Sequence, residues 1–338
     1  MPSSRFFRIG HFSMGFHYWS KEIIPEIDQM ISSISFGVDA KLSDAIVHLV
    51  LIESDITEDS ISSFELPERG KEILLNVKRA IESLSSDNGS DEISLFVLAK
   101  IVDLGSRDWF SPELKMFFFH DQDGLLFCYS LIFDKKIRSD LIQNRITNYI
   151  LFLATYWYAL NQGLILHSAA VAYGKKGYLF LGQGGAGKST ASTIGAENGL
   201  SVLSDDLSFV KINIITNRYE QAASPGPISR YSTAPLLQPN LCGIYRLIQD
   251  TQDYLTPLSE FEIAHLLFRS FQWSQWVARL PKPIISQAFY TSCDIARKVS
   301  GYELHFRKSP DFLSLIIAPS DEKNKNDQRR NISLGTNP

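Results

Sequence analysis

A phosphate-binding loop is the clearest chemical feature of this sequence. Residues 182–189 read GQGGAGKS, which matches the pattern G-x-x-x-x-G-K-[ST]. Glycines let several backbone N–H groups turn toward one anion, and the helix that follows adds the partial positive charge of its N-terminus. The lysine of the pattern reaches the β and γ phosphates of a nucleotide, and the serine hydroxyl is a ligand for Mg²⁺. These residue types at this spacing predict a site for ATP and Mg²⁺.

The predicted nucleotide-binding residues are contiguous in the chain. They are Gly182, Gln183, Gly184, Gly185, Ala186, Gly187, Lys188, Ser189 and Thr190. Two other interpretations are a glycine-rich turn without a ligand and a dinucleotide-binding fingerprint, because three of the glycines also fit G-x-G-x-x-G. The fingerprint leaves Lys188 and Ser189 without a role, and no acidic residue ends the next strand at the usual ribose-binding distance. An apolar run before the loop and a helix-compatible segment after it favour the phosphate-binding loop.

Two adjacent aspartates follow the loop at the end of the next expected strand. Asp205 and Asp206 lie 17 and 18 residues after Lys188. One carboxylate can hold Mg²⁺ while the other orients or deprotonates an attacking hydroxyl. Because side chains alternate along a regular strand, both can face one site only if the strand ends there. The alternative is a single metal-binding aspartate with a solvated neighbour.

Together, these residues resemble a known family, that of HPr kinase/phosphorylase and its kinase-like relatives. The resemblance is to the C-terminal kinase domain, and it rests on LHSAAVAY (166–173), YLFLGQGGAGKST (178–190) and GLSVLSDDLSFV (199–210). His167 precedes Lys188 by 21 residues, which, with the two aspartate spacings, is similar to the family's arrangement. The resemblance implies an α/β fold with a P-loop core like that of HPr kinase and of phosphoenolpyruvate carboxykinase, preceded by an N-terminal α+β region.

The resemblance also implies roles for individual residues. Asp206 would be the general base toward a serine hydroxyl, and Asp205 its metal-side or orienting partner. His167 would line the active site, whereas without the resemblance a packed histidine on a buried strand is the simpler interpretation. The family's Arg-Gly-rich segment with its glutamate is missing after the aspartates, and AASPGPISRYSTAP (222–235) occupies the corresponding region. This departure argues against phosphorylase activity and against HPr as the substrate.

Two arginines are further candidates for contact with phosphate or with an anionic substrate. Arg230 and Arg246 follow the aspartates, and a guanidinium suits bidentate contacts with oxyanions. The alternative for each is an ordinary surface or structural arginine.

Three functional hypotheses follow from these residues. The first is an ATP- and Mg²⁺-dependent kinase that phosphorylates a hydroxyl, with serine preferred, on a peptide, a protein or a small molecule. The second is a nucleotide-binding regulatory or partner protein with weak ATPase and no transferase activity. The third, a carboxykinase-like enzyme, would need a further set of His and Lys metal ligands that the sequence does not display. Because the parent family forms oligomers, a homo-oligomer is an open alternative.

The elements before the site are expected to form an N-terminal α+β region over residues 1–135. Runs of apolar residues predict strands at 45–53 and 94–102, with an irregular connection at 54–71. Two aromatic-rich runs around a turn that ends in glycine predict a β-hairpin at 115–133. Nothing in this region carries recognisable chemistry.

The elements that must position the site are expected in a kinase-like domain over residues 136–318. We predict a helix at 137–160, a strand at 164–173, a turn at 174–177, a strand at 178–182, a helix from Lys188 to Asn198 that Gly199 ends, and a strand at 200–206. This order is the one that an α/β nucleotide-binding core requires.

The remainder of the chain is expected to alternate loops and helices from about 213. Apolar spacing predicts a helix at 258–273, with Ser259 as its N-cap and Glu262 in capping-box position. The polar tail at 319–338 is expected to be disordered.

Composition narrows the functional class further. A net charge of −4 gives no electrostatic case for binding nucleic acid. Three widely spaced cysteines without a CxxC pattern predict neither disulfides nor a zinc site, and they favour a reducing compartment, the cytoplasm. The most apolar run, 149–160, is shorter than the roughly 20 residues that a membrane-spanning helix needs, so a buried helix is expected there.

Overall fold

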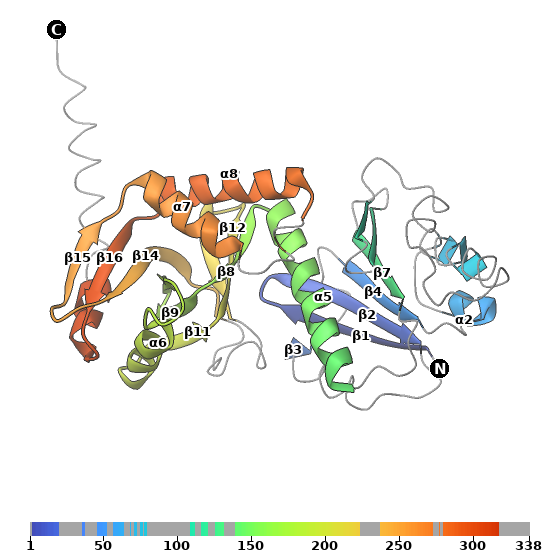
Figure 1. The fold of residues 1–338 in the computed structure, drawn as a ribbon, viewed down its shortest axis with the longest axis horizontal. Helices are drawn as coiled ribbons and strands as arrows, with labels where there is room; N and C mark the ends of the chain where they lie inside the picture. Colours follow the sequence, from blue (N-terminus) through green and yellow to red (C-terminus); the bar gives the residue numbers. More distant parts are fainter. Residues whose placement is uncertain are drawn as a thin grey trace, which may run out of the picture. The chain divides into compact units, whose positions relative to one another are not determined.

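The computed structural model divides the chain into two compact units. It describes residues 2–19, 36–37, 46–52, 57–63, isolated positions from 68 to 79, 109–111, 116–120, 126–131, 139–223, 237–272, 277 and 280–317. The units are Met1–Ala154 and Thr155–Pro338, and their boundary lies within helix α5 (Ser139–Leu160) (Figure 1). The predicted division after residue 135 lies just before this helix. The strand expected at 94–102, Arg230 and the tail at 319–338 lie outside the described residues.

The first unit contains a seven-stranded mixed sheet among the residues described. Its strands are β1 (Pro2–Ile9), β2 (Phe12–Trp19), β3 (Phe36–Gly37), β4 (Ile46–Ile52), β5 (Trp109–Ser111), β6 (Met116–His120) and β7 (Leu126–Leu131), in the order β3-β1-β2-β4-β7-β6-β5. β4 confirms the strand predicted at 45–53, and the antiparallel pair β6–β7 confirms the predicted hairpin.

One local prediction in this unit is wrong. The segment expected to be an irregular connection contains the helix α2 (Glu58–Ser62). The side chain of Thr57 accepts a hydrogen bond from the backbone N–H of Ser60 and so caps the first turn. A threonine followed by two acidic residues is a helix-start signal that the apolar pattern does not reveal.

The second unit is built on a curled mixed sheet of nine strands in the described part of the chain. The strands are β8 (Gly163–His167), β9 (Ala169–Tyr173), β10 (Lys176–Leu181), β11 (Ser201–Ser204), β12 (Leu207–Asn213), β13 (Arg218–Ala222), β14 (Asn240–Gln249), β15 (Tyr254–Pro257) and β16 (Gly301–Phe306). The main order is β11-β9-β10-β14-β13-β12-β8, and β16 pairs with both β14 and β15. The chain is therefore mixed α/β.

The curl of this sheet comes from two breaks that lie opposite each other. The segment predicted as one strand at 164–173 is two strands, because the chain changes pairing partner at Ser168: β8 pairs with β12, and β9 pairs with β10 and β11. The opposing segment breaks at Asp205 and Asp206, between β11 and β12. β8 and β9 are therefore consecutive in the chain but lie near opposite ends of the strand order, and so do β11 and β12.

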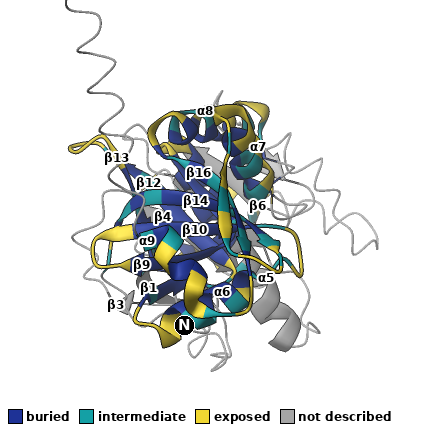
Figure 2. Cartoon of the chain, turned by 90° about the vertical axis from the view of Figure 1, so that its left-hand side faces the viewer, coloured by how far each residue is buried: buried dark blue, intermediate teal, exposed yellow. Residues whose placement is uncertain are grey.

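Helices cover both faces of this sheet. They are α6 (Lys188–Glu197), α7 (Glu260–Phe271), α8 (Lys282–Lys298), the short 3₁₀ turn η4 (Pro310–Phe312) and α9 (Leu313–Ile317). α6, η4 and α9 pack on a buried cluster that includes Phe180, Tyr245 and Phe306, while α7 and α8 contact β8. Figure 2 shows the strands as largely buried and the outer faces of α7 and α8 as exposed.

Several local predictions in this unit are confirmed. α6 ends at Glu197 and is followed by Gly199 with φ of 89°. α7 begins after Ser259, and both hydrogen bonds of the capping box with Glu262 are present. α5 is buried from Ile150 to Ala159, as expected for the apolar run. None of the described helices has the combination of length and hydropathy that crossing a bilayer demands.

The expectation that loops and helices alternate after residue 213 predicted α7 but missed the strands of this region. Four strands, β13 to β16, lie there, and the ten-residue β14 is at the centre of the sheet. β14 has three consecutive buried residues at its centre, Gly243, Ile244 and Tyr245, so the simple alternation of a half-exposed strand is interrupted there.

Candidate active site

The glycine-rich loop connects β10 directly to α6. Gly187 has φ of 100°, and a Cβ atom there would lie 2.8 Å from Cζ of Phe306, so both its backbone and its surroundings require glycine. A Cβ atom at Gly182 would lie 2.6 Å from that of Ala186. α6 has no side-chain N-cap, which leaves N–H groups of its first turn without a capping partner. The start of α6 therefore offers unpaired donors beside the loop.

Lys188 is the first residue of α6, and its side chain folds back over the loop. It is 8% exposed, and its ammonium group donates hydrogen bonds to the carbonyl oxygens of Gly182 (2.9 Å) and Gln183 (3.4 Å). Burial lowers the pKa of Lys188, and the negative charge of Asp206 acts in the opposite direction. A cation is thus held over the loop, within electrostatic reach of Asp206.

The two aspartates lie in the break between β11 and β12. The Ser204 hydroxyl donates to the carbonyl of Leu207 (2.6 Å) and accepts from the N–H of Asp206 (3.3 Å), which closes the corner. The N–H of Ser168 donates to the carbonyl of Asp206 across the break (2.9 Å). Since the regular strand ends at Ser204, the condition for both carboxylates to face one site is met.

His167 and Asp206 form the polar contact at this corner. Nε2 of His167 lies 3.3 Å from Oδ1 of Asp206, and the two side chains are 44% and 64% exposed. A hydrogen bond from His167 is the main cause that lowers the pKa of Asp206, and the positive charge of Lys188 also lowers it, against the effect of burial. The carboxylate is therefore held in its ionised form and remains open to a ligand.

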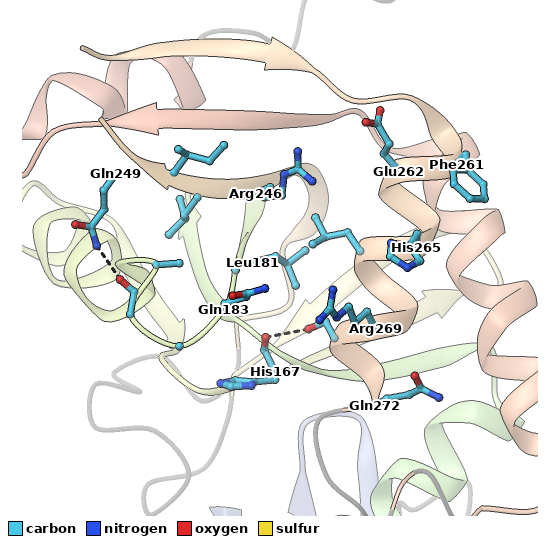
Figure 3. A pocket seen from close by; sticks show the side chains of 18 residues that line it. His167, Leu181, Gln183, Arg246, Gln249, Phe261, Glu262, His265, Arg269 and Gln272 are labelled. Atoms are coloured by element: carbon cyan, nitrogen blue, oxygen red, sulfur yellow. Dashed lines mark hydrogen bonds between the residues drawn. The ribbon is translucent and has the colours of Figure 1, made fainter. Parts of the chain in front are cut away.

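A cavity of about 770 Å³ lies between the glycine-rich loop and α7. Figure 3 shows the residues that line it. They are His167, Leu181, Gly182, Gln183, Gly184, Gly185, Ala186, Arg246, Leu247, Ile248, Gln249, Phe261, Glu262, His265, Leu266, Arg269, Ser270 and Gln272. The hydroxyl of Ser270 donates to the backbone carbonyl of His167 (2.9 Å), which fixes the end of α7 beside the carboxylate corner. The side-chain amide of Gln249 donates to the carbonyl of Gly185 (2.7 Å), so β14 supports the loop.

Arg246 lines the cavity as part of a chain of charges. It forms an ion pair with Glu303, whose other oxygen is 3.5 Å from Nε2 of His305, and Nδ1 of His305 is 2.8 Å from Asp250. Nε of Arg246 is buried without a hydrogen-bond partner among the described residues. This arginine therefore has a structural pairing in addition to its place in the cavity wall.

Sequence analysis missed the contribution of α7. Arg269 lines the cavity from α7 (Figure 3). It is exposed and has no ion-pair or hydrogen-bond partner among the residues described, whereas Arg246 is paired with Glu303. A signal for it exists in the sequence. Glu262, His265 and Arg269 are spaced by three and four residues, so the predicted helix had to place them on one face.

The predicted site residues are thus distributed as follows. The structure brings together the loop, Lys188, His167 and Asp206, and it places Asp205 beside Asp206 in the strand break. Arg246 lies across the cavity on β14. No family model matches the chain, and no curated protein matches it. The functional argument therefore rests on the geometry of the site.

Proposed function

We propose that this protein is an ATP- and magnesium-dependent kinase that transfers the γ-phosphoryl group to a hydroxyl, preferably that of a serine. The observation that carries the proposal is the ionised Asp206, held by His167 and within electrostatic reach of the buried ammonium of Lys188 beside a glycine-rich loop. A base next to an anion site is the arrangement that phosphoryl transfer to a hydroxyl needs. We also propose that the strand–loop–helix unit β10–α6 belongs to a P-loop core of the HPr-kinase-like kind, in a cytoplasmic protein.

In the proposed reaction, the acceptor oxygen forms a bond to the γ-phosphorus as the bond to the β–γ bridging oxygen breaks. The bridging oxygen keeps the electron pair and leaves as part of ADP, and the hydroxyl proton passes to Asp206. Lys188 and the N–H groups at the start of α6 bind the phosphate oxygens. The cavity that His167 and the loop line would hold the reactants, whereas Lys188, Asp205 and Asp206 lie outside its lining.

Magnesium fits the oxygen donors that the chain offers here. Ser189 is exposed at the start of α6 and its hydroxyl has no partner among the described residues, and Asp205 lies in the break beside Asp206. Mg²⁺ commonly binds one or two protein oxygens together with phosphate oxygens and water. When bound, it neutralises the charge that develops on the phosphates. We propose Ser189 and Asp205 as its protein ligands.

Phosphoryl transfer itself is the direct test of this proposal. The protein is incubated with a cell extract, Mg²⁺ and ATP labelled in the γ-phosphate, and labelled molecules are identified by mass spectrometry. We expect a small set of labelled hydroxyl acceptors and none with Asp206→Asn. The proposal is rejected if ATP binds but no acceptor is labelled, which would favour the regulatory nucleotide-binding alternative.

In this proposal, Arg269 places a further positive charge beside the γ-phosphoryl group during its transfer. Replacing it with methionine keeps most of the side-chain length and removes the cation. We expect kcat to fall about 10- to 100-fold with little change in ATP affinity, since one charge-assisted hydrogen bond is lost in the transition state. Steady-state kinetics and calorimetry measure the two quantities. Arg218→Met, an exposed arginine on β13 outside both the cavity and the groove between α7 and α8, is the matched control, and an equal loss in the control would contradict the assignment.

His167 sets the pH at which the proposed base works. Its hydrogen bond lowers the pKa of Asp206, so the active carboxylate persists to lower pH than an ordinary aspartate. In His167→Ala this pKa rises, and the acid limb of the kcat/KM profile moves to higher pH. The profile is measured from pH 4 to 8. An acid limb that stays in place would show that Asp206 is not the titrating base.

A further inference from the structure

Exposed aromatic side chains gather where α7 and α8 face each other. Phe261 of α7 is 79% exposed, and Phe289 and Tyr290 of α8 are 44% and 64% exposed. Between the helices lies a groove of about 200 Å³, here called the α7/α8 groove. Most of its walls are apolar, and Glu260 and Arg297 add one charge of each sign. The lining residues are Glu260, Phe261, Ala264, His265, Phe268, Phe289, Cys293 and Arg297. A contiguous apolar surface of this kind, open to solvent, is typical of a site where another molecule binds.

The α7/α8 groove adjoins the cavity of the candidate active site. Phe261 and His265 line both the groove and the cavity. In Figure 3 the two side chains project from α7 at the cavity. The same helix bonds to His167 through Ser270 at its other end. A chain that presents a hydroxyl to Asp206 can therefore run along α7 and place another side chain in the groove.

The length of α7 sets the spacing between the two contacts. Ala264 in the groove precedes Ser270 by six residues, which is about 9 Å along a helix that rises 1.5 Å per residue. An extended peptide advances about 3.3 Å per residue and covers that distance in about three residues. The side chain that fills the groove would thus stand about three residues from the hydroxyl.

We propose that the α7/α8 groove docks the acceptor, and that the acceptor is a polypeptide with a large apolar side chain about three residues from the phosphorylated hydroxyl. This inference rests on the proposed kinase function. The groove of about 200 Å³ has room for about one large side chain, and it shares Phe261 and His265 with the candidate active-site cavity, so an acceptor peptide that also reaches this cavity fits it better than a second copy does. Burial of one Leu or Phe side chain corresponds to about 10- to 100-fold in affinity.

The experiment uses fluorescein-labelled peptides with one serine in a Gly-Ala background and one phenylalanine placed at each position within six residues on either side. Binding to the full chain with ADP and Mg²⁺ is measured by anisotropy, and phosphate incorporation is measured with ATP. We expect binding and KM to improve about 10- to 100-fold when phenylalanine is about three residues from serine. Phe289→Ser should abolish the improvement without changing kcat, whereas Tyr173→Ser, an exposed aromatic on β9, should not.

A second measurement does not depend on how the variants fold. Cys293 lies in the groove, so the best peptide should slow its alkylation by N-ethylmaleimide in the unmodified protein, as located by mass spectrometry.

The outcomes separate this inference from the kinase proposal. Transfer without a phenylalanine preference, or with a preference that Phe289→Ser leaves intact, overturns the docking site alone. Binding that depends on phenylalanine and on Phe289, without transfer to serine, supports the docking site and overturns the kinase. A dimer that Phe289→Ser dissociates, seen by sedimentation, shows that a second copy occupies the groove. Absence of both binding and transfer overturns both proposals.

Discussion

Asp206→Asn is expected to lower the rate of phosphoryl transfer about 10²- to 10⁴-fold, the usual contribution of a positioned general base. ATP affinity should stay the same or rise slightly, because the variant removes a negative charge within electrostatic reach of Lys188, the proposed phosphate ligand. Single-turnover transfer and calorimetric ATP binding measure the two effects. The amide keeps the size of the side chain and leaves the Ser204 and Ser168 bonds to the Asp206 backbone available, so the corner should fold normally.

Asp205→Asn is the matched variant for this experiment. If Asp205 holds Mg²⁺, higher Mg²⁺ concentration should restore much of its activity, whereas it should restore none in Asp206→Asn. Equal rescue of both variants would show that the two carboxylates share the metal role. Normal transfer by Asp206→Asn would remove Asp206 from the mechanism altogether.

Lys188→Met is expected to weaken ATP binding about 10- to 100-fold and to abolish detectable transfer. The ammonium makes charge-assisted contacts with phosphate in the proposed complex, and such contacts contribute about 1.5–3 kcal/mol each. Methionine fills similar volume at a site that is 8% exposed, so the fold should persist. Thermal unfolding checks the binding directly: ATP and Mg²⁺ should raise the midpoint of the unmodified protein and leave that of the variant nearly unchanged.

Lys282→Met is the control, since Lys282 is an exposed lysine at the start of α8 and lies outside the cavity. The variant should retain the full ATP-dependent shift. An equal shift in Lys188→Met would mean that the glycine-rich loop does not bind nucleotide through this lysine.

Local signals explain which parts of the site could be predicted. The loop, the start of α6 at Lys188 and its end before Gly199 depend on residues adjacent in sequence, and so does the capping box of Ser259 and Glu262. For the corner at Asp205 and Asp206, the sequence predicted only a requirement. The strand must end there if both carboxylates are to serve one site. The structure meets that condition.

Long-range pairing explains most of what could not be predicted. The break at Ser168 arises because β8 and β9 pair with different partners, which no local pattern in 164–173 specifies. β14 was missed because three consecutive buried residues at its centre, which begin with Gly243, interrupt the alternation of apolar and polar residues that would mark a strand. The pairing of Arg246 with Glu303 depends on β14 and β16 lying side by side. Arg269 is a different case, since helical spacing from Glu262 was sufficient to find it.

The central claim is that the γ-phosphoryl group passes from ATP to a hydroxyl acceptor through the site at His167, Lys188 and Asp206. Its most direct test is the rate of ADP release, measured with and without a phosphorylatable acceptor, alongside mass spectrometry of that acceptor. The kinase account predicts that the acceptor accelerates ADP release and gains one phosphoryl group for each ADP formed. Slow ADP release at the same rate with or without acceptor, and no phosphorylated product, would contradict it.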